Sequence, residues 1–123
     1  MNKKRINDIY QFMSNARMSK LSDDEKVTVI TLLRMMKPVA VSVQEAAQDA
    51  FATAKAEYPD DQQKATELFN KSMADILNQE VDIDLRVLTD DAFGRLCLSN
   101  DWTFAQMDEL EAELVRSDTN LPA

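Results

Sequence analysis

Residues 22–58 decide the fold, and they read SDDEKVTVITLLRMMKPVAVSVQEAAQDAFATAKAEY. Ser22 and Glu25 form a capping box, in which the Ser22 hydroxyl accepts from the Glu25 amide and the Glu25 carboxylate accepts from the Ser22 amide. Pro59 follows the stretch and cannot continue a helix. The stretch therefore predicts one long helix over residues 22–58.

Pro38 lies inside this predicted helix and removes one backbone hydrogen bond, at a cost of about 3 kcal/mol. Residues 39–43 also alternate in a way that would suit a strand. An apolar pattern with a period of seven nevertheless continues past the proline. We therefore expect a continuous helix with a kink at Pro38, and the alternative is a break at Lys37.

The seven-residue pattern predicts a seam through which copies of the chain associate. At about 1.5 Å per residue the helix would be about 55 Å long, whereas a compact domain of this size is about 35 Å across. A seam that projects beyond the domain needs a partner, so we predict a homo-oligomer. The alternative is a monomeric bundle that buries the seam internally. The seam consists of Val29, Leu33, Met36, Ala40, Val43, Ala47, Ala50 and Ala54.

Four further segments have the apolar spacing or the start signals of helices. The segment 62–79 follows a short link, so it should be an antiparallel neighbour of the long helix. Thr89 and Thr103 read as N-caps, and Gln106 completes a second capping box. Gly94 inside a predicted helix indicates the close approach of another backbone. The four predicted helices cover residues 4–17, 62–79, 90–99 and 104–115.

Residues 80–86 change to a period of two, which predicts one short, half-exposed edge strand. Its apolar residues Val81, Ile83 and Leu85 alternate with Asp82, Asp84 and Arg86. A single strand cannot satisfy its own backbone, so it would pair with a second copy or with another protein. An ordered extended linker is the alternative.

The composition agrees with a helical fold. The chain has 123 residues, of which 45% are hydrophobic and 29% charged, and it contains a single glycine. Sheets and tight hairpins usually need more glycine. We therefore predict a mainly α bundle that forms a single domain over residues 1–115, with a flexible tail over 116–123.

Catalytic chemistry is not expected, because the chain has no histidine and only one cysteine. The commonest general base and the usual zinc ligands are therefore missing. Cys97 stands in an apolar context and predicts a buried structural thiol. Asp82 and Asp84 share a face of the predicted strand, but solvated acidic residues explain them better than a magnesium site does. We predict a protein that is not an enzyme and has no cofactor, metal or small-molecule substrate.

The formal net charge of −8 argues against nucleic-acid and membrane partners. Basic residues cluster at the start, where Lys3, Lys4 and Arg5 could at most make a small DNA-associated arm. From Glu80 onward the acidic residues far outnumber the arginines. The alternative function is therefore an acidic nucleic-acid mimic that inhibits a basic DNA-binding protein. The leading prediction is a non-enzymatic helical protein–protein interaction or scaffold protein.

Three short segments carry a resemblance to known proteins: residues 3–10 (KKRINDIY), 21–26 (LSDDEK) and 88–93 (LTDDAF). In these segments the chain resembles the small acidic helical accessory proteins of phages and prophages. The resemblance implies a virion-associated or host-interacting role and supplies no catalytic residues. The start of the chain lacks the apolar stretch of a secretory signal, so we expect a cytoplasmic protein, or one in the host cytoplasm or the virion.

Overall fold

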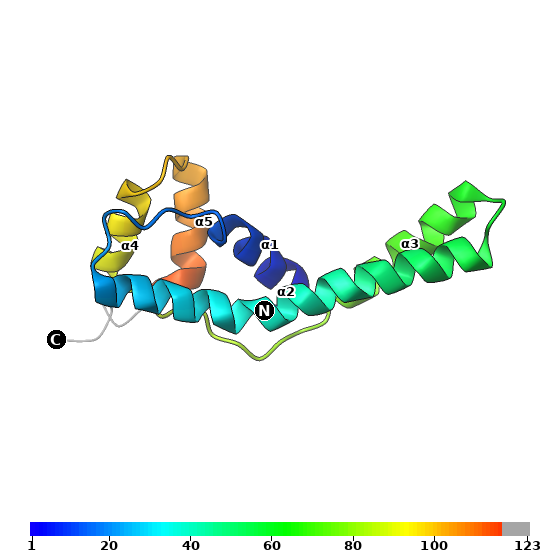
Figure 1. Cartoon of the computed structure of the whole chain (residues 1–123), viewed down its shortest axis with the longest axis horizontal. Helices are drawn as coiled ribbons and strands as arrows, with labels where there is room; N and C mark the ends of the chain where they lie inside the picture. Colours follow the sequence, from blue (N-terminus) through cyan, green and yellow to red (C-terminus); the bar gives the residue numbers. More distant parts are fainter. Residues whose placement is uncertain (117–123) are drawn as a thin grey trace. The chain divides into compact units, whose positions relative to one another are not determined.

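A computed structural model describes residues 1–116 and shows a mainly helical protein (Figure 1). In this part of the chain the structure contains isolated bridges but no β-strand. Of the predicted tail over 116–123, residues 117–123 lie outside the described residues. The helices are α1 (Lys3–Met13), α2 (Asp23–Glu57), α3 (Gln62–Leu77), α4 (Asp90–Leu98) and α5 (Phe104–Leu114).

The chain forms two compact units, each built from two separate segments. Unit 1 contains Met1–Tyr10 and Met36–Asp82, and unit 2 contains Gln11–Met35 and the described residues from Ile83 onward. Helix α2 supplies residues to both units. The single domain over 1–115 remains a prediction.

The long helix begins where the capping box predicts. The Ser22 amide donates to Glu25 Oε1 at 2.8 Å, and the Glu25 amide donates to Ser22 Oγ at 3.2 Å. Helix α2 continues through Pro38, so the alternative of a break at Lys37 is not found. A kink at Pro38 remains a prediction. Among the described helices α2 alone is long and apolar enough to cross a membrane, a test that a core helix also passes.

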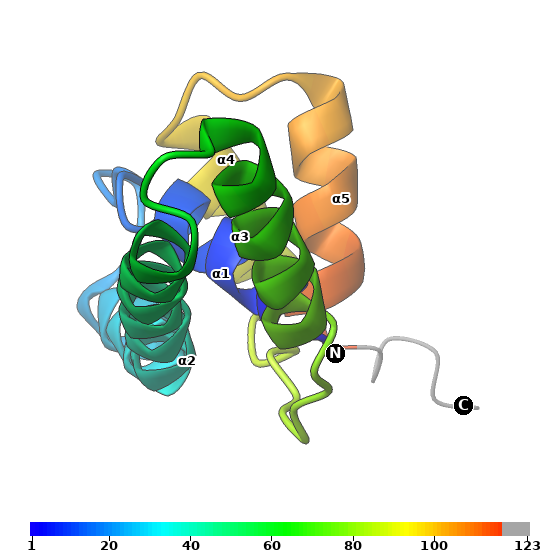
Figure 2. The same cartoon turned by 90° about the vertical axis from the view of Figure 1, so that its right-hand side faces the viewer.

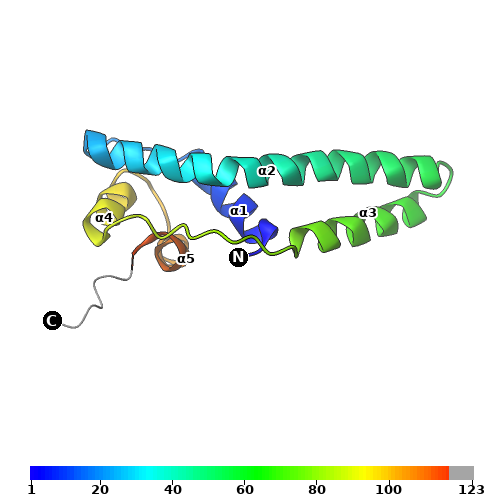
Figure 3. The ribbon, with the colours of Figure 1, turned by 90° about the horizontal axis from the view of Figure 1, so that it is seen from below.

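In unit 1 the second half of α2 and helix α3 form an antiparallel hairpin, as predicted (Figure 3). A view along α2 shows α3 beside it (Figure 2). The link contains Pro59, and the Asp61 carboxylate caps α3 by accepting from the Lys64 amide at 3.1 Å. The buried apolar side chains of this unit are Ile6, Ile9, Met36, Ala40, Val43, Ala50 and Ala54.

The predicted edge strand is not found in residues 80–86. The segment is extended, and its backbone pairs only briefly with the start of the chain: the Lys3 amide donates to Gln79 O at 3.0 Å and the Val81 amide to Met1 O at 2.8 Å. Within residues 1–116 no neighbouring strand continues the ladder beyond this point. Extended backbone with alternating burial produces the same sequence pattern as a strand, which explains the error.

In unit 2 both predicted N-caps are present. The Thr89 side chain accepts from the Ala92 amide, and Thr103 and Gln106 form a reciprocal capping box at the start of α5. Leu88 and Leu114 are joined by a backbone hydrogen bond of 3.0 Å, which ties the entry of α4 to the end of α5. The larger buried side chains of this unit are Met13, Leu21, Val29, Leu32, Leu85, Leu88, Phe93, Leu96, Leu110, Leu114 and Val115.

Polar and aromatic contacts connect the two segments of unit 2. The Asn100 side chain accepts from the Arg17 amide at 2.7 Å and donates to Arg17 O at 2.9 Å. The rings of Phe12 and Trp102 lie 5.1 Å apart, centroid to centroid, with a tilt of 44°. These contacts fix the segment that follows α1 against the loop between α4 and α5.

The structure corrects the prediction that another backbone approaches Gly94 closely. Gly94 lies inside α4 with a helical backbone and no positive φ, and a Cβ atom built there would have no neighbour within 4 Å. The expected close approach of another backbone is therefore wrong, because the position faces open space.

Replacing Gly94 by Ala should stabilise the protein by about 0.5–1 kcal/mol, since alanine loses less backbone entropy in a helix and no clash opposes it. Urea denaturation followed by circular dichroism measures this gain. A variant less stable than the wild type would show that a neighbour occupies the space.

The ion pair between Glu25 and Arg95 generates a second prediction. The Arg95 guanidinium donates to both Glu25 oxygens, with Nε 2.9 Å from Oε1, and it lowers the pKa of Glu25 from 4.5 to about 2. A lowered carboxyl pKa stabilises the fold fully above about pH 4.5, and this contribution is lost as the pH falls towards 2. Glu25→Gln keeps a capping side chain but removes the charge.

We expect Glu25→Gln to have a lower free energy of unfolding than the wild type at pH 7, and the difference to shrink steadily below pH 4.5. Urea denaturation across this pH range measures it. If the difference is the same at pH 7 and pH 3, the charge of Glu25 is not its source.

Candidate protein-interaction site

An open cleft of about 520 Å³ lies at the closed end of the α2–α3 hairpin. It is formed by the last turns of α2, the link at Pro59 and the first turns of α3. Its volume is within the range of known binding sites. The lining residues are Phe51, Ala54, Lys55, Tyr58, Pro59, Gln62, Ala65, Thr66 and Phe69.

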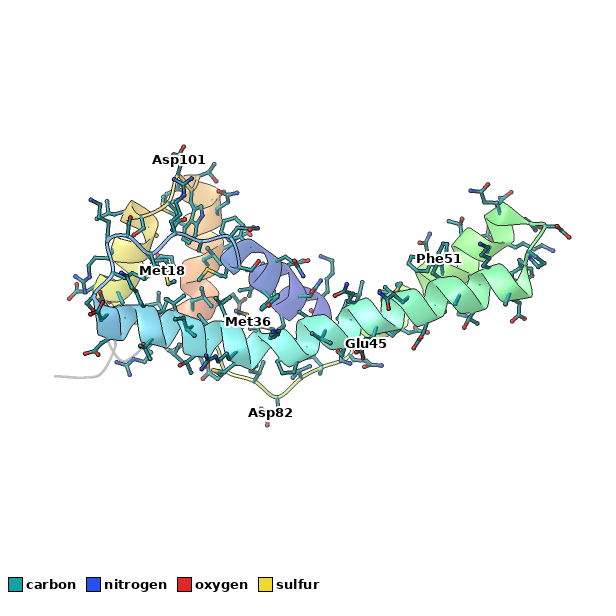
Figure 4. The ribbon with its side chains drawn as sticks, in the orientation of Figure 1. Met18, Met36, Glu45, Phe51, Asp82 and Asp101 are labelled. Carbon is teal, nitrogen blue, oxygen red and sulfur yellow. The ribbon has the colours of Figure 1, made fainter. Side chains whose placement is uncertain are left out.

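The cleft combines small residues with aromatic ones: Ala54 and Ala65 lie between the rings of Phe51, Tyr58 and Phe69 in its lining. Ala50 and Ala54 are buried, with 9% and 2% of their surface exposed, whereas Phe51 remains 62% exposed. Phe51 lies beside α3 (Figure 4). Alanine side chains cannot fill the space next to three aromatic rings, so the apolar walls of the cleft stay in contact with solvent.

Helix α3 has an apolar stripe but no buried residue. Leu68, Phe69 and Met73 are each only half-buried. A helix in a globular protein normally packs such a stripe against a core. One neighbouring helix covers only part of the stripe, and the hairpin is left with an unfinished apolar face.

The cleft has few charged groups. Lys55 is its only charged lining residue. Lys64 lies nearby, with its Nζ 5.9 Å from the centre of the Tyr58 ring, which is within the range of a cation–π contact. The lining offers no carboxylate, thiol or imidazole, and its titratable side chains are Lys55 and Tyr58.

The predicted seam is divided between the core and its margin. Val29, Met36, Ala40, Val43, Ala50 and Ala54 are buried inside this chain, and Leu33 and Ala47 are half-buried. The buried members pack inside this chain, and association of copies through the seam remains a prediction. The heptad identified apolar positions correctly but did not show what covers them.

None of the residues of the predicted edge strand is part of the cleft lining. Val81 and Ile83 are half-buried and Leu85 is buried. Asp82 is exposed on the extended segment (Figure 4). Asp84 accepts from the Arg86 guanidinium at 3.0 Å, and Arg86 lowers the pKa of Asp84.

The described residues contain neither a cluster of metal ligands nor an activated thiol. No three His, Cys, Asp or Glu side chains in residues 1–116 are grouped so that they could hold a metal ion. Cys97 is half-buried in unit 2, and burial raises the pKa of its thiol. A raised thiol pKa reduces the thiolate fraction and therefore the reactivity of the cysteine.

Sequence reasoning missed the cleft, although one signal was present. Phe51, Tyr58 and Phe69 stand close to the predicted turn at Pro59, on the two helices that the turn joins. Aromatic residues are enriched in interfaces relative to the rest of a protein surface.

Comparisons with known proteins identify no family for this chain. It matches no protein-family model, no curated protein and no solved structure.

Proposed function

We propose that the protein is a non-enzymatic helical protein–protein interaction or scaffold protein, which acts as a homo-oligomer through the α2–α3 hairpin. One observation carries the proposal: α3 buries none of its side chains, yet it bears an apolar stripe next to an open apolar cleft.

The energetics of burial support an external partner. Each Å² of apolar surface removed from water contributes roughly 25 cal/mol, and the half-exposed rings of the hairpin leave much of this stabilisation unused. Helical bundles usually reach a closed core with four helices. A second hairpin would supply the missing helices.

The polar chemistry of the cleft supports a binding role over a catalytic one. Lys55 and Tyr58 are its titratable lining residues, and no acidic or thiol group lies among them. A lining with so few polar groups suits an apolar surface, and it supplies neither a thiol nor a carboxylate as a nucleophile.

A glutamate at Phe51 tests the proposal, because its charge would be desolvated in the interface. Wild-type protein should form a dimer or larger species by light scattering across a tenfold concentration range, and Phe51→Glu should be monomeric with unchanged helix content. Thr53→Glu is the matched control, since Thr53 is exposed on the opposite side of the same helix and does not line the cleft.

Two outcomes would contradict the proposal. The first is a wild-type protein that remains monomeric at every concentration. The second is an oligomer that Thr53→Glu and Phe51→Glu weaken equally, which would place the contact outside the hairpin cleft.

The alternative function, an acidic nucleic-acid mimic, has one observation in its favour. Arg86 and Arg95 are held by Asp84 and Glu25, so both arginines are neutralised locally. The surrounding acidic side chains of unit 2, such as Asp90, are exposed. Binding to a basic DNA-binding protein that competes with DNA and disappears at moderate salt would favour this alternative.

A further inference from the structure

The two faces of the α2–α3 hairpin differ in charge. On α3, Lys64, Glu67, Lys71 and Asp75 follow one another at spacings of three and four, so they form one exposed stripe. The cleft-lining residues Gln62, Thr66 and Phe69 follow a separate row at the same spacing, and this row continues without a charge. The uncharged row of α3 is Gln62, Thr66, Phe69, Met73 and Leu77.

A matching row runs along α2. It passes through the cleft-lining residues Phe51, Lys55 and Tyr58, again at spacings of three and four. Glu45 and Asp49 lie off this row, on another side of α2. The row of α2 is Gln44, Gln48, Phe51, Lys55 and Tyr58. We call the two rows together the cleft face, and Lys55 is its only charged member.

We propose that a second copy of this chain covers the cleft face, so that two hairpins form a four-helix bundle related by a two-fold axis. This inference rests on the proposed function and names the partner and the surface. A two-fold contact uses the same patch on both copies. The side chains of the patch must therefore be compatible with their own counterparts in the second copy.

Charge makes the cleft face the part of the hairpin on which a second copy meets the least repulsion. Each copy carries a net charge of −8, so two copies repel one another over most of their surfaces. The cleft face has no acidic residue, and it allows the two copies to approach without placing carboxylates opposite each other. Its aromatic and methionine side chains also match the composition of interface cores.

The dimensions of the cleft face are sufficient for a modest dimer. The 16 residues of α3 correspond to about 24 Å of helix, and two adjacent helices are about 20 Å wide. The face therefore measures on the order of 500 Å² in projection, near the lower end of the area that each partner buries in a specific complex. We expect a dimer that dissociates on dilution.

Cross-linking through introduced cysteines tests the inference. In a Cys97→Ser background, Thr66→Cys places a thiol on the cleft face and Lys71→Cys places one on the charged stripe of the same helix. Both native residues are exposed. With a short bis-maleimide, Thr66→Cys should give at least about tenfold more covalent dimer than Lys71→Cys, because the interface brings the two Thr66 positions together and keeps the two Lys71 positions on outer surfaces.

Light scattering on the same two variants separates the inference from the proposed function. If they are dimeric but cross-link equally, or only through Lys71→Cys, the cleft face is not the interface and the inference fails while homo-oligomerisation stands. If the wild type and both variants are monomeric at every concentration, the proposed function fails as well. Preferential cross-linking of dimeric Thr66→Cys supports both.

Discussion

Helix α2 is the constraint on which the rest of the structure depends. It extends without interruption from Asp23 to Glu57, and both compact units take part of their core from it. With a single glycine in the chain, few positions allow the backbone to turn sharply, so one long helix is a natural result. Its apolar residues exceed what the chain buries: Val27, Ile30, Val41 and Phe51 remain exposed along it.

Local signals in the sequence predicted the helix starts well. The capping residues at Ser22, Thr89 and Thr103 act on amides three residues away, so their geometry depends on no distant part of the chain. The same residues explain much of the resemblance to phage accessory proteins, since segments 21–26 and 88–93 coincide with these starts. Phage association therefore stays an expectation.

Long-range features could not be predicted in the same way. The alternation of Val81, Ile83 and Leu85 was real, but it reflected uneven burial of an extended segment, and a strand also needs a partner that periodicity does not reveal. The heptad from Val29 to Ala54 had the same weakness, because apolar spacing does not distinguish an internal contact from one between copies. The cleft was missed because it depends on how small and large side chains meet across two helices.

The positions of the aromatic side chains have a practical consequence for studying the two units. Trp102, the only tryptophan, belongs to unit 2 and packs against Phe12, whereas both tyrosines, Tyr10 and Tyr58, belong to unit 1. Tryptophan fluorescence therefore reports on unit 2, and tyrosine difference absorbance reports on unit 1 once the overlapping tryptophan absorbance is subtracted, so neither signal needs a label. Denaturation curves from these two signals will coincide if the units unfold as one cooperative body and separate if they unfold independently.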